Sequence, residues 1–118
     1  MAQVAREPED FLPLKAAEFH ILMVLADQER HGYGIMQQIE PETSGAIVLG
    51  PGTLYTTIKR LLKRGLIEEV DAPVHADDPR RKYYGLTPLG GQVIRAEVER
   101  LAQLLRKAEQ IGLLGDAS

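Results

Sequence analysis

Hydroxyl groups and cations recur at helical spacing along residues 51–67, in a pattern suited to binding an anionic polymer. At about 100° per residue, one side of a helix here carries Gly52, Thr53, Thr56, Lys59, Arg60 and Lys63. Small residues in the first turns let a backbone approach base edges, and cations further along can hold phosphates. The pattern predicts a helix that enters the major groove of double-stranded DNA. The alternative is a surface helix whose polar side is only solvated.

The same segment contains the signals that position such a helix. Pro51 suits the first turn, where its missing N–H is not needed, and Gly65 suits the left-handed residue that ends a helix. The opposite side carries the apolar residues Leu54, Ile58, Leu61 and Leu62. We therefore expect one side of the helix to face a core and the other to face solvent or DNA.

The residues before this segment predict two more helices. Leu14, Ala17, Ile21 and Leu25 recur at helical spacing within residues 14–28. Residues 31–40 predict a turn into a short second helix, which we expect to end at Glu40 because the next residue is Pro41. Residues 44–50 form an apolar connector. Together with the helix that follows, this is the order of a helix-turn-helix.

After Gly65 the hydrophobic period changes from helical to alternating. Residues 66–72 and 80–86 favour β-strands, and the proline-flanked segment 73–79 joins them as a hairpin, or wing. We expect Arg80, Arg81 and Lys82 to lie on the returning strand, where they can reach phosphates. The alternative is a solvated edge strand with protective charges.

A long helix is predicted from Thr87, its N-cap, to about Gly112, with Pro88 in the first turn. Its apolar residues repeat as a heptad seam thickened on one side: Ile94, Val98, Leu101, Leu104, Leu105 and Ala108. A domain this small cannot cover about 37 Å of helix. We expect this seam to form a homodimer by packing on the same helix, or on the first helix, of a second copy. Folding back onto its own domain is the alternative.

The chain is mainly α with a small β-hairpin, divided into an N-terminal arm (1–13), a DNA-binding domain (14–86), a dimerisation helix (87–112) and a tail (113–118). Its 118 residues carry a formal net charge of −3, but residues 51–86 hold seven Lys and Arg against five Asp and Glu. The basic excess is thus local, as one DNA-facing side requires. Cysteine is absent, and no apolar run is long enough for a membrane span, so we expect a cytoplasmic protein.

The histidines do not indicate an enzyme or a metal site. His20, His31 and His75 fall in different expected elements, with no carboxylate or nucleophile at ligand spacing. No glycine-rich phosphate loop precedes a helix. We therefore expect no catalytic residues, no metal and no cofactor; the alternative is a two-histidine metal site shared across a dimer.

Four motifs together resemble a known family. HGYGI from His31, PGTLY from Pro51, the following KRLLKRGLI, and RRKYYGLTPLG from Arg80 are similar in order and spacing to the phenolic-acid-decarboxylase-regulator (PadR) family of bacterial transcription regulators. The resemblance is to the smaller subgroup, which has one C-terminal helix. It implies a winged helix-turn-helix that dimerises through that helix and usually represses transcription. In many members a small aromatic or drug-like ligand, bound near the dimer interface, releases the DNA.

Carried over by motif, the resemblance places Gly52, Thr53 and Thr56 at the DNA and Arg81 and Lys82 on the wing. Tyr55 would lie at the edge of the core, and Tyr33 would either touch the DNA backbone or pack. Two departures follow from the sequence. Asp77 and Asp78 stand where relatives often carry glycine and basic residues, so deep insertion of the wing is not expected. Tryptophan is absent, so no tryptophan wall can line a ligand pocket.

The competing function is a protein-binding winged helix whose basic side meets an acidic partner. The salt dependence of binding to duplex DNA distinguishes the two functions. Binding to a DNA operator releases counterions, so it weakens steeply as salt rises, yet it keeps its sequence preference.

Overall fold

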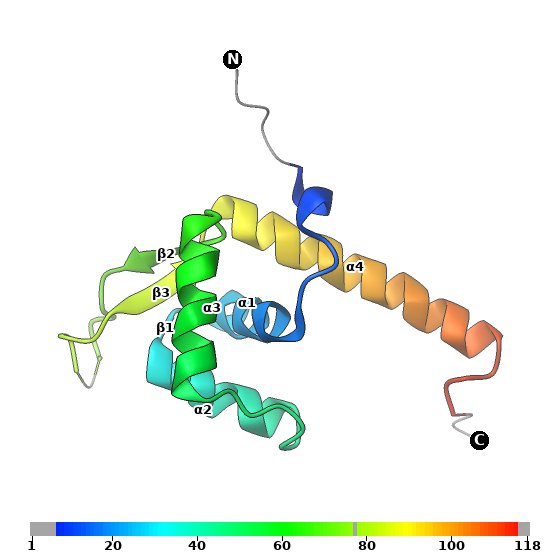
Figure 1. Ribbon diagram of the computed structural model, residues 1–118, viewed down its shortest axis with the longest axis horizontal. Coiled ribbons are helices and arrows are strands. Elements are labelled where there is room, and N and C mark those ends of the chain that lie inside the picture. The colour runs from blue at the N-terminus through cyan, green and yellow to red at the C-terminus, as the bar shows by residue number, and fades with distance from the viewer. Residues whose placement is uncertain (1–6, 77, 116–118) are drawn as a thin grey trace, which may run out of the picture.

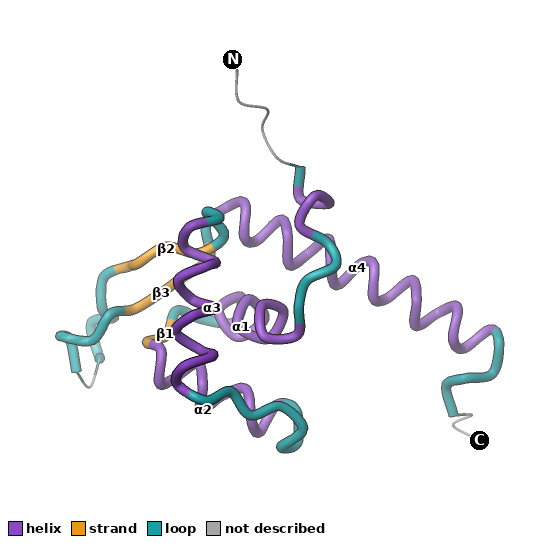
Figure 2. The backbone as a smooth tube through the Cα atoms, in the orientation of Figure 1, coloured by secondary structure: helices purple, strands orange, loops and turns teal. Residues whose placement is uncertain are grey.

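The computed structural model describes residues 7–76 and 78–115, in which helices pack beside a small antiparallel sheet that lies at one side of the molecule (Figure 1). In chain order the elements are η1 (Pro8–Phe11), α1 (Ala16–Asp27), β1 (Arg30–His31), α2 (Gly32–Glu42), α3 (Pro51–Lys63), β2 (Ile67–Val70), β3 (Tyr83–Leu86) and α4 (Pro88–Gln110). Figure 2 shows the short strands beside α3 and the loop of the wing projecting beyond them. The mainly helical winged helix-turn-helix predicted from the sequence is confirmed.

The sheet contains one strand more than the expected hairpin. Its order is β1-β3-β2, and all neighbours are antiparallel. In β1, Arg30 pairs with Tyr84 and His31 with Tyr83, where the sequence predicted only a turn. Two residues are too few to show an alternating pattern, so β1 exists because the fold places them beside β3.

Two element boundaries also differ from expectation. β3 begins at Tyr83, so Arg80, Arg81 and Lys82 precede the strand instead of lying on it. α2 continues through Pro41 to Glu42. The helix ends directly after this turn at Thr43, whose backbone N–H and hydroxyl both donate to the Ile39 carbonyl, at 3.1 and 3.0 Å.

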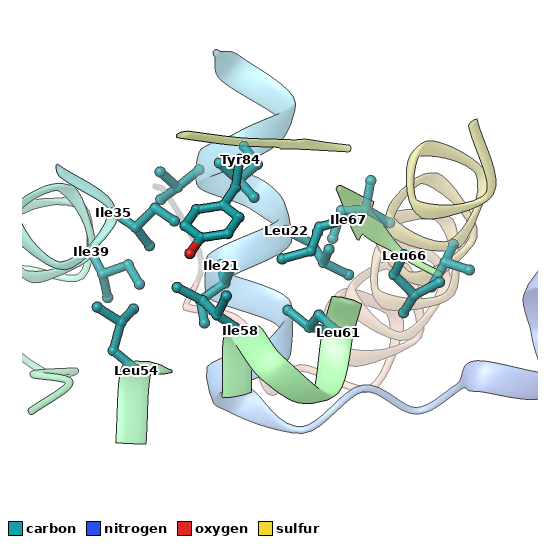
Figure 3. Packing of buried hydrophobic residues seen from close by; sticks show 14 of the residues in the cluster. Ile21, Leu22, Ile35, Ile39, Leu54, Ile58, Leu61, Leu66, Ile67 and Tyr84 are labelled. Atoms are coloured by element: carbon teal, nitrogen blue, oxygen red, sulfur yellow. The ribbon is translucent and has the colours of Figure 1, made fainter. Parts of the chain in front are cut away.

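The core forms around α1, which packs against α2, α3, α4 and β3. Leu54, Ile58 and Leu61 of α3 are buried against it, as predicted for the inner side of that helix (Figure 3). Full burial of an aliphatic side chain of this size contributes about 1.5–3 kcal/mol. This packing fixes the rotation of α3 about its own axis and therefore fixes which residues face outward.

The end of α3 is set by the glycine identified from the sequence. Gly65 has φ of +76°, the left-handed region that an L side chain rarely adopts. The Leu66 N–H donates to the Leu61 carbonyl at 3.0 Å and the Gly65 N–H to Leu62 at 3.1 Å, the pattern of a Schellman motif. The chain leaves α3 here and enters β2 directly.

Thr87 caps α4 as predicted, since its Oγ1 accepts from the Gly90 N–H at 3.0 Å. The first half of α4 packs on the domain, while the second half extends away from it (Figure 1). Among residues 7–76 and 78–115, no helix combines the length and apolarity needed to cross a membrane.

The N-terminal segment forms the short extra turn η1, which packs on α4. Phe11 enters the core and is only 4% exposed. Of the expected arm and tail, residues 1–6 and 116–118 lie outside the described residues.

Candidate nucleic-acid interface

The outward side of α3 presents the residues that the sequence singled out. Gly52, Thr53, Thr56, Lys59, Arg60 and Lys63 are all exposed. Thr57, which the sequence pattern did not assign, is buried, and its hydroxyl donates to the Thr53 carbonyl at 2.7 Å. The outward surface thus combines small residues in the first two turns with cations in the next two.

Three cations on this side form no ion pair with any residue that the structure describes. Among the ion pairs of the described chain, none includes Lys59, Arg60 or Lys63. Three unpaired positive charges on one helix face create a local positive potential that attracts polyanions, although the whole chain is acidic.

Arg64 behaves differently from its three basic neighbours in the sequence. Its Nη1 donates to Oε2 of Glu18 on α1 at 3.0 Å, and its guanidinium lies 4.9 Å from the centre of the Phe11 ring. The run of four cations in the sequence therefore divides in two: three face outward, and Arg64 holds the C-terminal end of α3 to α1.

On the Tyr55 edge of α3, a hollow of about 460 Å³ joins the helix to the base of the wing. It is lined by His31, Gly32, Tyr33, Tyr55, Arg81, Lys82 and Tyr84. Nη1 of Arg81 lies 3.3 Å from both ring nitrogens of His31, and its guanidinium lies 5.7 Å from the centre of the Tyr33 ring. The fold therefore brings Arg81 and Lys82 beside α3 even though they precede the strand.

Tyr55 is half-exposed and rests on Gly32 at the start of α2. A Cβ at Gly32 would lie 2.7 Å from the Tyr55 hydroxyl oxygen, so any side chain there would displace the ring. This close approach explains the first glycine of the HGYG motif: it lets α2 and α3 meet through the tyrosine.

The cations of the wing are balanced by nearby carboxylates. Asp78 pairs with two arginines: its Oδ1 lies 3.2 Å from Nε of Arg80 and its Oδ2 lies 3.8 Å from Nε of Arg81. Oε2 of Glu69 lies 3.9 Å from Nζ of Lys82. Such exposed pairs contribute little to stability, but they lower the positive potential at the wing. Asp77, the other acidic residue noted in the sequence, lies outside the described residues.

Lys15 was not identified from the sequence, yet it lies beside α3. A hollow of about 520 Å³ on the other edge of the helix is lined by Lys15, Ala17, Glu18, Gly52, Thr53, Thr56, Thr57 and Arg60. No local pattern distinguishes this lysine, which precedes α1 by one residue. Only the packing of α1 across α3 places it there.

The apolar stripe of α4 is largely exposed. Val98, Leu101, Leu104 and Leu105 are uncovered, and Ala108 is half-buried. Ile94 differs, because it is 5% exposed within the core of its own domain. Between α1 and α4 lies a groove of about 520 Å³, lined by Met23, Ala26, Leu86, Gly91, Ile94, Arg95, Val98 and Glu99.

Comparisons with known proteins agree with this architecture. Residues 21–96 match the model of the transcriptional regulator PadR-like family. A transcriptional regulator of Mycobacterium tuberculosis is 33% identical over 92 residues, which cover 78% of this chain and 81% of that protein. An uncharacterised protein of Lysinibacillus sphaericus is 33% identical over 84 residues, covering 71% of this chain and 76% of that protein.

Two solved structures show a similar fold. A transcriptional regulator from Clostridium thermocellum has a TM-score of 0.65 at 26% identity, covering 80% of this chain and 87% of that one. A PadR family transcription regulator from Clostridium difficile has a TM-score of 0.69 at 24% identity, covering 82% and 98%. The family match over more than half of the sequence, together with the 33% identity to the Mycobacterium tuberculosis regulator, shows that the chain belongs to the PadR-like family of transcriptional regulators.

Proposed function

We propose that this regulator binds double-stranded DNA as a homodimer and represses transcription by occupying an operator. The observation that supports the proposal most is the outward side of α3, where threonines are exposed together with three cations that no ion pair of the described residues includes. The inner side is mainly apolar, with Thr57 as its one buried polar residue. A helix of this kind can enter a major groove. Occupation of an operator by the dimer would exclude the transcription machinery from the same DNA.

Each outward residue has a proposed role. Thr53, Thr56 and Lys59 face base edges, and Gly52 allows the backbone to come close to them. Arg60 and Lys63 bind phosphates next to the bases that Thr53, Thr56 and Lys59 contact. Arg81 and Lys82 hold the phosphates next to the Tyr55 edge, in competition with Asp78 and Glu69.

We propose that the second copy covers the exposed stripe of α4. Leu101 and Leu105 lie in the second half of α4, where the described residues leave them exposed. An antiparallel α4 from the partner would bury this stripe, and its end would reach the groove between α1 and α4. The two copies of α3 would then enter successive major grooves about 34 Å apart on a pseudo-palindromic site.

The same groove is where we propose that a small apolar or aromatic effector acts. Its apolar lining and its volume of about 520 Å³ suit a small ligand, and Arg95 and Glu99 add polar groups. A ligand seated beside the partner helix would change the separation of the two α3 helices, and operator affinity would fall.

Two substitutions on α3 separate base reading from phosphate binding. Lys63→Ala is expected to weaken binding to every duplex by the same factor and to reduce the salt dependence, because a lost phosphate contact releases fewer counterions. Thr56→Ala is expected to change the relative affinities for single-base variants of the operator by about 10-fold, while the salt dependence stays the same. Both effects are measured by fluorescence anisotropy on a panel of duplexes over a series of salt concentrations.

Lys107→Ala is the matched control, since it removes the same charge near the far end of α4. It should leave both affinity and salt dependence as in the unsubstituted protein. The assignment of roles is wrong if Thr56→Ala changes the salt slope and Lys63→Ala changes the sequence preference.

A further inference from the structure

We propose that Lys15 is a further phosphate-binding residue, placed on the opposite side of α3 from the wing. This inference rests on the proposed DNA binding and extends it to a residue outside the helix-turn-helix and the wing. It would give each subunit cations on both edges of the helix in the groove.

Lys15 lies on the edge of α3 that is opposite the wing. At 100° per residue, Thr53 and Arg60 lie on one edge of the outward side and Tyr55 on the other. Lys15 lines the hollow on the Thr53 and Arg60 edge, whereas Arg81 and Lys82 line the hollow on the Tyr55 edge. A major groove about 12 Å wide has a phosphate backbone along each side of an inserted helix. Lys15 therefore stands where the second backbone would pass.

The backbone at Lys15 is held by two side-chain carboxylates. The Leu14 N–H donates to Oε2 of Glu97 at 2.8 Å, and the Lys15 N–H donates to Oε1 of Glu18 at 2.9 Å. Both carboxylates are buried, with Glu97 2% and Glu18 3% exposed. Two successive N–H groups are thus fixed by buried acceptors from two different helices, so the Lys15 side chain starts from a fixed point.

The two carboxylates are themselves neutralised, so they do not repel a phosphate. Glu18 is paired with Arg64 and Glu97 with Arg100. The hydrogen bond from Arg100 holds the pKa of the Glu97 carboxyl below its usual value, and the Leu14 N–H adds to this, whereas burial acts in the opposite direction. Glu97 therefore stays ionised and keeps accepting from Leu14.

The ammonium group of Lys15 remains available for an external partner. The side chain is exposed, and no ion pair within the described chain includes it. The outward residues that line the same hollow are Arg60, Gly52, Thr53 and Thr56, and the one acid in its lining, Glu18, is paired with Arg64. An exposed lysine that is in no ion pair of the described chain, and that lies next to a proposed DNA surface, is well placed to bind a DNA phosphate.

The test compares Lys15→Ala, Lys15→Arg and Lys107→Ala in the full chain, on an operator duplex and an unrelated duplex from 50 to 400 mM salt. For Lys15→Ala, the slope of log affinity against log salt should fall in magnitude by about 0.9 for each subunit bound, or about 1.8 for a dimer. Affinity should fall by the same factor on both duplexes. Lys15→Arg should keep the slope of the unsubstituted protein, because the charge remains.

The result that overturns this assignment is an unchanged slope for Lys15→Ala while Lys63→Ala lowers it on the same duplexes. In that case DNA binding through α3 stands and only the role of Lys15 is lost. If the unsubstituted protein binds neither duplex, the proposed function fails and the role of Lys15 fails with it.

Discussion

Leu101→Asp is expected to convert the protein from a dimer to a monomer and to reduce operator affinity by about 100-fold or more. Leu101 lies near the middle of the exposed stripe of α4, with 38% of its surface accessible in the single chain. A partner helix packed there would enclose an unpaired carboxylate, which is too costly for the contact to persist. A monomer binds one half-site alone and loses the gain in affinity that comes from linking two.

Sedimentation equilibrium measures the first effect and anisotropy titration of an operator duplex the second. Gln103→Asp is the matched control, because it places the same carboxylate on an exposed position of α4 away from the stripe. It should stay dimeric. Our interpretation of the stripe is wrong if Leu101→Asp sediments as a dimer with an unchanged circular dichroism spectrum.

Gly90→Ala is expected to destabilise the fold by about 3 kcal/mol or more, at the upper end of what overpacking costs. Gly90 lies in the first turn of α4 and packs against the backbone of Leu66, which connects the end of α3 to β2. A Cβ at this position would overlap the carbonyl oxygen of Leu66. That oxygen belongs to the backbone and accepts from the Thr87 N–H at 3.2 Å, so it cannot rotate away.

Urea unfolding followed by circular dichroism measures this loss. Gly52→Ala is the comparison, because a Cβ there meets nothing within 4 Å and alanine favours a helix over glycine by up to about 1 kcal/mol. It should unfold at the same or a higher urea concentration than the unsubstituted protein. Equal midpoints for the two variants would show that α4 does not approach Leu66 as closely as described.

The two sides of α3 could be predicted from the sequence because helical periodicity, a proline and a glycine all agree over one segment. Leu54 and Leu61 are buried, Thr56 and Lys63 are exposed, and Gly65 has the left-handed conformation that ends the helix. The same agreement of local signals held for the Thr87 cap. Where several local preferences favour the same structure as tertiary packing does, the sequence alone is enough to predict it.

The features that could not be predicted depend on contacts between residues far apart in the chain. β1 needs β3 beside it, and Lys15 needs α1 to lie across α3. Arg64 is part of a basic run in the sequence, but its partner Glu18 is 46 residues away. Neither periodicity nor composition carries this information, so one cation of the run was not distinguished from its neighbours.

The electrostatic potential of the wing could not be predicted from the sequence either. Counting charges placed Arg80, Arg81 and Lys82 among the cations available to DNA, whereas each of them faces a carboxylate. The distance between opposite charges decides the local potential, and the sequence gives only their number. We therefore expect α3 to contribute more than the wing to the affinity for DNA.

We propose that the outward side of α3, presented twice by a dimer, reads DNA sequence. The most direct measurement is selection of bound fragments from random duplex DNA, followed by titration of the selected duplex at rising salt. We predict an enriched inverted repeat whose half-site centres are about 10 base pairs apart, with affinity that falls steeply as salt rises. Recovery of no enriched sequence, or of fragments whose binding does not depend on salt, would show that α3 does not read DNA in this way.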